Sequence, residues 1–243
     1  MKKIQLRELQ LIELSLLKQF ASFCDNNGLK YYLIDGTLLG AIRHDGFIPW
    51  DDDIDVGMPI EDYKKFLNLT NKTKIASNID VLSIYNKKGY LYLETKLCDN
   101  RTKLIEFPNN HPYEIGAYID IFPFYHQPND DLKYKDMHRK SRKLVRKHWR
   151  VLRSSLDYID SANLLKRIIG YFLSFYAKTL YNNNYLKRLE KMWASYPKGE
   201  YIGFYWDNET GQRILQEVVG ETIKKQFEDA VFWIPKNLSL IHI

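Results

Sequence analysis

The chain is organised around one stretch, Pro49-Trp50-Asp51-Asp52-Asp53-Ile54-Asp55-Val56, in which four carboxylates occupy five positions. Successive side chains of an extended strand point to opposite faces, so Asp53 and Asp55 are predicted to share one face while Ile54 and Val56 enter the core. Aspartate is depleted in strands and like charges repel, so the run needs a compensating cation. We expect Mg²⁺ or Mn²⁺, hard ions that take oxygen ligands from carboxylates and substrate phosphates.

A solvated acidic turn is the alternative interpretation, and two features elsewhere favour a site. A strand-glycine-helix pattern precedes the run at Ile34-Asp35-Gly36-Thr37, and Asp120 follows it between Ile119 and Ile121. Three carboxylates on neighbouring strands can hold two metal ions, an arrangement used in phosphoryl transfer. Asp53, Asp55 and Asp120 are therefore the predicted metal-binding and catalytic residues. Asp51 and Asp52 are expected to shape the loop, with one of them as an optional ligand of a second ion.

Composition indicates a folded protein with a sizeable core. The chain has 243 residues, of which 45% are hydrophobic and 27% are charged. Cys24 and Cys98 lack the spacing of a disulfide framework or a zinc site, which favours a reducing compartment. The longest apolar run, Ile168 to Ala177, is about half of the ~20 residues that a transmembrane helix needs, and we expect it to pack in the core, with an interfacial contact as the alternative. We therefore expect the protein to be cytoplasmic. If it contacts lipid, we expect it to do so at the inner face of the membrane.

Hydrophobic periodicity predicts an α+β (α/β-type) fold with strands in the first half and helices in the second. The predicted elements are a helix over 4–24, a strand over 31–34, a short helix over 38–43 capped by Thr37, the acidic strand, a helix beginning at Pro59, strands over 81–85, 90–97, 102–107 and 117–122, and helices over 137–152, 161–180 and 185–193. The last strand is expected to end at Pro123, and no closing element is predicted after Ile234. We divide the chain into a core over 1–125 and a mostly helical region over 126–243 packed against it.

Positive charge is concentrated between Lys133 and Arg153, where ten Lys or Arg accompany one acid, Asp136. This stretch has a net charge of +9, whereas the whole chain has +6, so the rest of the chain is net negative. Three interpretations stay open: a solvated amphipathic helix, a helix that contacts anionic lipid headgroups, and a nucleic-acid site. Trp149 is its only tryptophan and no nucleic-acid-binding motif accompanies it, so we expect no nucleic-acid partner.

These blocks together resemble the nucleotidyltransferase superfamily, whose pattern is a glycine-containing turn, an acid-apolar-acid strand and a later third acid. More closely, Gly36 to Arg43 and Ile48 to Asp55 look like the LicD family, and Ile119 to Pro123 looks like its later block. The resemblance extends diffusely over most of the chain, and fifteen residues separate Thr37 from Asp53, as is usual for LicD-like sequences. It implies a nucleotidyltransferase-like mixed sheet with metal-binding acids at the three positions above. LicD-like sequences continue past the 234–237 segment into a Tyr-Gly-Asp-containing stretch that is absent here, which is consistent with a C-terminal truncation.

The resemblance also implies a reaction. LicD-like proteins transfer a phosphorylated alcohol, typically phosphocholine, from a CDP-linked donor to a hydroxyl of a surface glycan such as a lipopolysaccharide, teichoic acid or capsule precursor. Gly36 and Thr37 are then expected to bind donor phosphate at a helix N-terminus, with a plain turn as the alternative. Arg43 would bind phosphate oxygens in a bidentate manner. Trp50 would stack on the cytosine or cover the choline ammonium, with core packing behind the acidic strand as its alternative.

Two other functions fit the same residues. The first keeps the fold but makes the chain an NTP-dependent nucleotidyltransferase that acts on a sugar phosphate, a protein or RNA. The second is a relative without activity that binds anionic glycan or lipid through Lys133 to Arg153.

Overall fold

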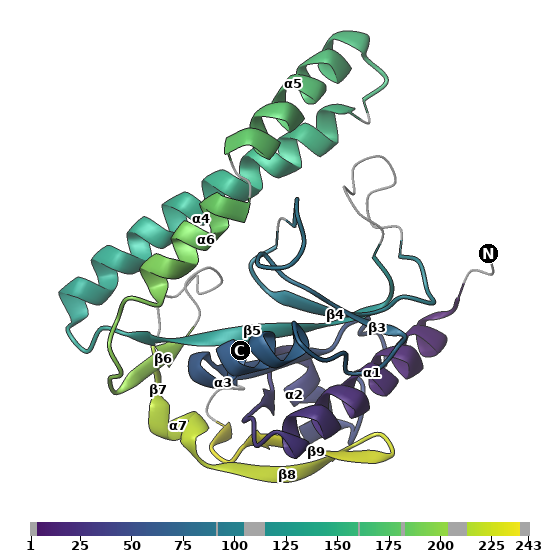
Figure 1. Cartoon of the computed structure of the whole chain (residues 1–243), viewed down its shortest axis with the longest axis vertical. Helices are drawn as coiled ribbons and strands as arrows, with labels where there is room; N and C mark the ends of the chain where they lie inside the picture. Colours follow the sequence, from purple (N-terminus) through teal and green to yellow (C-terminus); the bar gives the residue numbers. More distant parts are fainter. Residues whose placement is uncertain are drawn as a thin grey trace.

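A mixed β-sheet forms the centre of the computed structural model, which describes residues 4–90, 92–104, 115–159, 161–180, 183–203 and 213–238 (Figure 1). The sheet has the order β1-β2-β5-β4-β3 and is extended by β6, which pairs with β5, and by β7, which pairs with β6. β2 and β5 run parallel, and the other described neighbours are antiparallel. The strands are β1 (Tyr32–Leu33), β2 (Asp55–Pro59), β3 (Ile79–Leu82), β4 (Thr95–Asp99), β5 (Tyr118–Gln127), β6 (Tyr201–Gly203), β7 (Ile214–Leu215), β8 (Thr222–Phe227) and β9 (Ala230–Pro235). The predicted α+β fold with a mixed sheet is confirmed.

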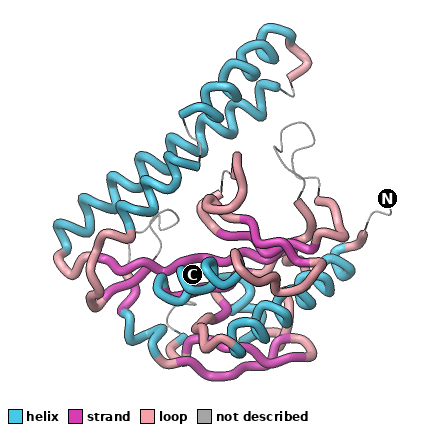
Figure 2. Tube along the Cα trace, in the orientation of Figure 1, coloured by secondary structure: helices cyan, strands magenta, loops and turns pink. Residues whose placement is uncertain are grey.

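The helices lie on either side of this sheet. They are α1 (Leu6–Asn26), α2 (Asp35–Arg43), α3 (Ile60–Thr70), α4 (Asp131–Ile159), α5 (Leu164–Leu180), α6 (Asn183–Trp193) and α7 (Gln216–Gly220). In the view of Figure 1, α1, α2 and α3 lie on one side of β5, whereas α4 and α5 form a long pair that projects away from the sheet on the other. Figure 2 shows that this arm is helical along its length. None of the helices in the described part of the chain is long and apolar enough to cross a membrane.

Side-chain alternation along β2 and β5 divides the interior into two clusters. Val56 and Ile121 belong to the main core, together with Phe20 of α1 and Phe66 of α3. The opposite face carries a smaller cluster, which consists of Tyr32, Ile34, Phe124, Ile202 and Val219. By the same alternation, Asp55 and Asp120 point to the face of the smaller cluster.

The acidic run is mostly loop, which corrects the prediction of a strand over its whole length. Regular pairing begins only at Asp55, and residues 51–54 precede β2 without regular secondary structure. The predicted alternation nevertheless holds, because Ile54 and Val56 are fully buried between less buried acids. The Ile54 carbonyl also accepts a hydrogen bond from the Asp120 N–H at 2.9 Å, so the connection to β5 starts one residue before the strand.

The prediction that the strand after Ala117 ends at Pro123 was wrong, since β5 continues to Gln127. On one edge, β4 pairs with residues 118–121 of β5, and β6 pairs with residues 125–127. Pro123 lies between these two stretches. Because neither β4 nor β6 pairs with β5 at this position, the missing N–H of proline breaks no hydrogen bond to them. Of the predicted strand over 102–107, the described part shows a single bridge between Leu104 and Ile115, and residues 105–107 lie outside the described residues.

The hairpin that precedes the C-terminal segment was not predicted from the sequence. The absence of a closing element after Ile234 stays a prediction, because residues 239–243 lie outside the described residues. β8 and β9 form an antiparallel hairpin that returns to the first half of the chain. At its turn, Glu228 accepts hydrogen bonds from Arg7 at 2.5 Å and from the Phe47 N–H at 3.2 Å, and its own N–H donates to the Asp45 carbonyl at 2.6 Å. The turn Glu228-Asp229 lacks the Asn-Gly or Asp-Gly pair that signals a hairpin in a sequence, which explains why the hairpin was missed.

Gly57 permits close contact between β2 and the smaller cluster. A Cβ at this position would lie 2.3 Å from the Phe124 ring and 3.0 Å from Ile34 and Tyr32, all of which are buried. Gly57→Ala is therefore expected to lower the free energy of unfolding by about 1 to 3 kcal/mol through overpacking. Thermal denaturation should show a lower Tm. Gly220→Ala, whose Cβ would meet nothing within 4 Å, is the matched control and should cause no loss.

Candidate active site

The centre of the candidate site is a row of three charged residues across three neighbouring strands. The register pairs Asp55 of β2 with Asp120 of β5, and Asp120 with Lys96 of β4. Lys96 Nζ donates to both carboxylate oxygens of Asp120, at 2.8 and 3.0 Å. Asp55 and Asp120 therefore lie on adjacent strands, as expected from the sequence, although 65 positions separate them along the chain.

The acidic loop adds three more carboxylates beside this row. One carboxylate oxygen from each of Asp51, Asp52 and Asp53 lies within 4.8 Å of the other two. In the described part of the chain, these three residues are therefore close enough to bind one metal ion together. The carboxyl groups of Asp51 and Asp53 are close enough to shift each other's pKa. Asp51 and Asp52 lie in the loop, as expected, but they belong to the same group of carboxylates as Asp53.

Burial and mutual repulsion raise the pKa values of these acids. Burial, followed by the charges of Asp51 and Asp52, raises the pKa of Asp53 to about 6. Burial, followed by the charges of Asp53 and Asp120, raises the pKa of Asp55 well above its usual range. Burial raises the pKa of Asp120 to about 7 despite the opposing effect of Lys96. A dense set of hard oxygen donors with one neighbouring ammonium fits a divalent cation such as Mg²⁺ or Mn²⁺.

Lys96 was not identified from the sequence. Its side chain is 3% exposed, and its ammonium lies 3.6 Å from the centroid of the Tyr118 ring and 3.7 Å from a Glu94 oxygen. A lysine is rarely buried without a charged partner. The sequence did offer one indication of this lysine, because Lys96 lies within the apolar pattern of the predicted strand over 90–97. A lysine buried there needs a carboxylate nearby.

Glu13 of α1 is a second residue that the sequence prediction missed. It is 3% exposed, and its Oε2 is buried without a hydrogen-bond partner. Burial, followed by the charges of Asp53 and Asp52, raises its pKa to about 9. Its position was visible as an acid within the apolar face of the predicted first helix. One turn earlier, the Gln10 side-chain amide donates to the Asp51 carbonyl at 2.9 Å, so this face of α1 supports the acidic loop.

Gly36 and Thr37 lie at the start of α2, which begins at Asp35 rather than at the predicted position 38. The Thr37 hydroxyl does not cap the helix as predicted; it is buried and accepts a hydrogen bond from the Asp55 N–H at 2.8 Å. A Cβ at Gly36 would lie 2.8 Å from an Asp51 carboxylate oxygen. The glycine therefore gives a carboxylate access to the helix N-terminus, which favours negative charge. Their binding of donor phosphate stays a prediction.

The two remaining predicted donor-binding residues are exposed. Arg43 lies in the last turn of α2, about 10 Å along the helix axis from Gly36. Trp50 is 78% exposed beside the acidic loop, so the alternative that it packs in the core behind the strand was wrong. Both side chains are accessible to a ligand, and their roles in binding a donor stay predictions.

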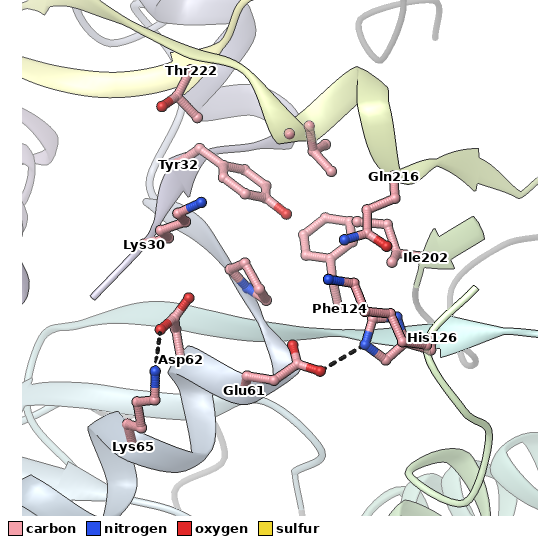
Figure 3. A pocket seen from close by; sticks show the side chains of 14 residues that line it. Lys30, Tyr32, Glu61, Asp62, Lys65, Phe124, His126, Ile202, Gln216 and Thr222 are labelled. Atoms are coloured by element: carbon pink, nitrogen blue, oxygen red, sulfur yellow. Dashed lines mark hydrogen bonds and ion pairs between the residues drawn. The ribbon is translucent and has the colours of Figure 1, made fainter. Parts of the chain in front are cut away.

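A cavity of about 320 Å³ lies toward the other end of β2 and β5 from the acids and is lined by none of the predicted site residues (Figure 3). Pro59 and Phe124 form part of its wall, and His126 Nε2 lies 2.7 Å from a Glu61 oxygen. The Tyr32 hydroxyl points toward it in Figure 3 and is buried without a hydrogen-bond partner. This cavity shares the sheet face of the acids, and its two carboxylates, Glu61 and Asp62, are paired with His126 and Lys65.

The mixed sheet and its row of acids define a nucleotidyltransferase-type domain. The family model described as "LicD/FKTN/FKRP, nucleotidyltransferase domain" matches residues 28–155, which include every predicted site residue. The chain belongs to this LicD/FKTN/FKRP family.

Curated relatives agree with this assignment. The chain is 30% identical over 250 residues to the lipopolysaccharide cholinephosphotransferase LicD of Haemophilus influenzae, a match that covers 96% of this chain and 87% of that protein. It is 41% identical over 123 residues to an uncharacterized protein of Rickettsia prowazekii, which covers 42% of each. It is also 30% identical over 109 residues to the ribitol 5-phosphate transferase FKRP of Mus musculus, which covers 45% of this chain and 19% of FKRP. The two relatives with named activities are transferases of phosphorylated alcohols.

Glu13 provides a test of the site's electrostatics. Its folded pKa of about 9 exceeds the usual value of 4.5, so its contribution to stability is intact below pH 4.5 and is lost as pH rises toward 9. Glu13→Gln removes this loss. We expect the variant to gain about 1 to 3 kcal/mol over the wild type at pH 8.5, and little at pH 4.5, in denaturation experiments with a chelator present.

Glu217→Gln, at an exposed position on α7, is the matched control. It should show the same difference from the wild type at both pH values. An equal effect of Glu13→Gln at pH 4.5 and 8.5 would show that Glu13 ionises normally in the folded protein.

Proposed function

We propose that the protein catalyses metal-dependent transfer of a phospho-alcohol group from a CDP-linked donor to a hydroxyl of a cell-surface glycan precursor, with phosphocholine as the transferred group. The observation that carries the proposal is the register that pairs Asp55 with Asp120 and Asp120 with Lys96 in a buried row. The named activities of the LicD and FKRP relatives support the reaction class. Phosphocholine is proposed as the transferred group because the relative that aligns over nearly the whole chain is a cholinephosphotransferase.

The reaction breaks one P–O bond and forms another. The acceptor hydroxyl attacks the phosphorus that bears the alcohol, the bond to CMP breaks, and CMP leaves. Asp120 receives the proton of the hydroxyl, and Lys96 holds the Asp120 carboxylate in place. A divalent ion bound by Asp53, Asp55 and Asp120 would neutralise the donor pyrophosphate and the charge that develops on the departing CMP.

Positioning of these groups depends on the surrounding backbone. The hydrogen bond from the Asp55 N–H to Thr37 ties the first residue of β2 to the first turn of α2. Gln10 holds the Asp51 carbonyl from the other side. Arg43 and Trp50, both exposed, are the proposed contacts for donor phosphate and for the cytosine or choline group.

Removal of a metal-binding carboxylate should strongly reduce turnover and leave the fold intact. Asp53→Asn and Asp55→Asn are expected to lower kcat/KM by about 10² to 10³-fold, because charge stabilisation in the transition state is lost. Neither variant should lower the Tm, since each relieves repulsion among neighbouring acids. Asp80→Asn, at a half-exposed acid on β3, is the control and should retain activity. Wild-type turnover by either site variant would contradict the proposal.

The released product separates the proposed reaction from its alternatives. With CDP-choline, CDP-glycerol or CDP-ribitol and a lipopolysaccharide or teichoic-acid precursor, we expect acceptor-dependent release of CMP, fastest with CDP-choline. Release of pyrophosphate from CTP, without CMP release from any CDP-alcohol, would instead indicate a nucleotidyltransferase. If neither product forms and calorimetry detects no binding of Mg²⁺ and CDP-choline, the chain is a relative without activity.

A further inference from the structure

Helix α5 carries a large apolar surface that the rest of the described chain leaves exposed. Leu164, Leu165, Phe172 and Phe175 are each between 66% and 71% exposed, and Ile168 and Ile169 are more than 40% exposed. The expectation that the run from Ile168 to Ala177 packs in the core was therefore wrong for these residues. Soluble monomers rarely expose contiguous apolar surface of this kind without a partner.

The exposed side chains form one stripe that faces away from α4. At 3.6 residues per turn, these six positions fall within an arc of about 140° around the helix axis. Gly170 is buried and lies about 170° from the centre of that arc, where α5 packs against α4. Figure 1 shows α5 along the outer part of the arm, away from the sheet. The stripe therefore has no described element of the chain against it.

Positive charge borders the stripe on both sides. Lys166 and Arg167 are exposed and lie about 60° beyond its two edges, and α5 contains no Asp or Glu. The neighbouring helix α4 adds a basic groove, which is lined by His138, Arg139, Arg142, Lys143, Arg146 and Lys147. An apolar stripe between cationic edges is the pattern of a helix that lies in the interface of an anionic bilayer.

We propose that α5 docks on an anionic membrane surface, with its apolar stripe in the headgroup-acyl boundary and its cationic edges against lipid phosphates. A second copy of the chain fits this surface less well, because two α5 helices in contact would bring Lys166 and Arg167 beside the same cations with no acid on either helix. The helix lies along the surface rather than across it, since its 17 residues do not meet the requirements of a membrane span. The basic residues from Lys133 to Lys147 of α4 contribute attraction at longer range.

Vesicle flotation of the full chain tests the proposal without any substrate, so its outcome is independent of the proposed reaction. The protein should float with vesicles of phosphatidylcholine that contain about one third phosphatidylglycerol, and should not float with pure phosphatidylcholine vesicles. Phe172→Ser combined with Phe175→Ser should weaken binding at least tenfold. Lys166→Glu combined with Arg167→Glu should also weaken it at least tenfold, because each cation near an anionic surface is worth about fivefold in affinity.

Two control variants match these changes elsewhere on the surface. Leu132→Ser removes an apolar side chain that is 78% exposed at the start of α4, and Lys72→Glu combined with Lys88→Glu reverses two exposed charges. Both should bind anionic vesicles as the wild type does. Circular dichroism at α-helical wavelengths should show that all four variants retain the wild-type helix content.

The proposal is overturned if the wild type does not bind anionic vesicles, or if the phenylalanine variant binds them as tightly as the wild type. It is also overturned if the wild type is a dimer by light scattering and the phenylalanine variant is a monomer without any difference in vesicle binding. That last result would assign the stripe to a second copy of the chain.

Discussion

The register between β2, β5 and β4 is the constraint on which the candidate site depends. It places Asp55, Asp120 and Lys96 side by side, in a part of the sheet where each charge is largely removed from water. Several carboxylates then share one ammonium, and burial together with this excess of negative charge raises the pKa values of Asp53 and Asp120. The surrounding structure keeps these groups together: Thr37 holds the Asp55 backbone, and Gln10 of α1 holds the loop. These contacts in the first half of the chain thus hold carboxylates close together although their negative charges repel one another.

The parts of this arrangement that sequence patterns could predict are local. Alternation of acids with Ile54 and Val56 indicated which side chains enter the core, and both are fully buried. The apolar context of Asp120 indicated a strand, and the resemblance of three short blocks to one family indicated that this strand lies near the acidic run. Each inference needed only a few consecutive residues, because the alternation of a strand and the match to a short sequence block are both visible over that length.

The parts that were missed depend on contacts between residues distant in sequence. Lys96 and Glu13 gain their importance only from the carboxylates that the fold places beside them, and neither lies in a recognisable motif. The exposed stripe on α5 has the same hydrophobic periodicity as a core helix, so composition alone predicted burial. A core helix and an exposed amphipathic helix differ in whether another element covers the apolar stripe, and that depends on the tertiary arrangement rather than on the sequence of the helix itself.

The contact between Arg7 and Glu228 has a consequence for how the protein is made. It joins residues 221 positions apart, and Glu228 also binds the backbone of the loop that precedes the acidic run. At the usual speed of a ribosome, about 5 to 20 residues per second, the first helix waits roughly 10 to 45 seconds for this partner. During that interval the nascent chain can pair β2 with β5 but cannot close the loop against the hairpin. The loop over 45–47 can therefore reach its folded position only after residue 228 has left the ribosome, later than the strands that carry Asp55 and Asp120.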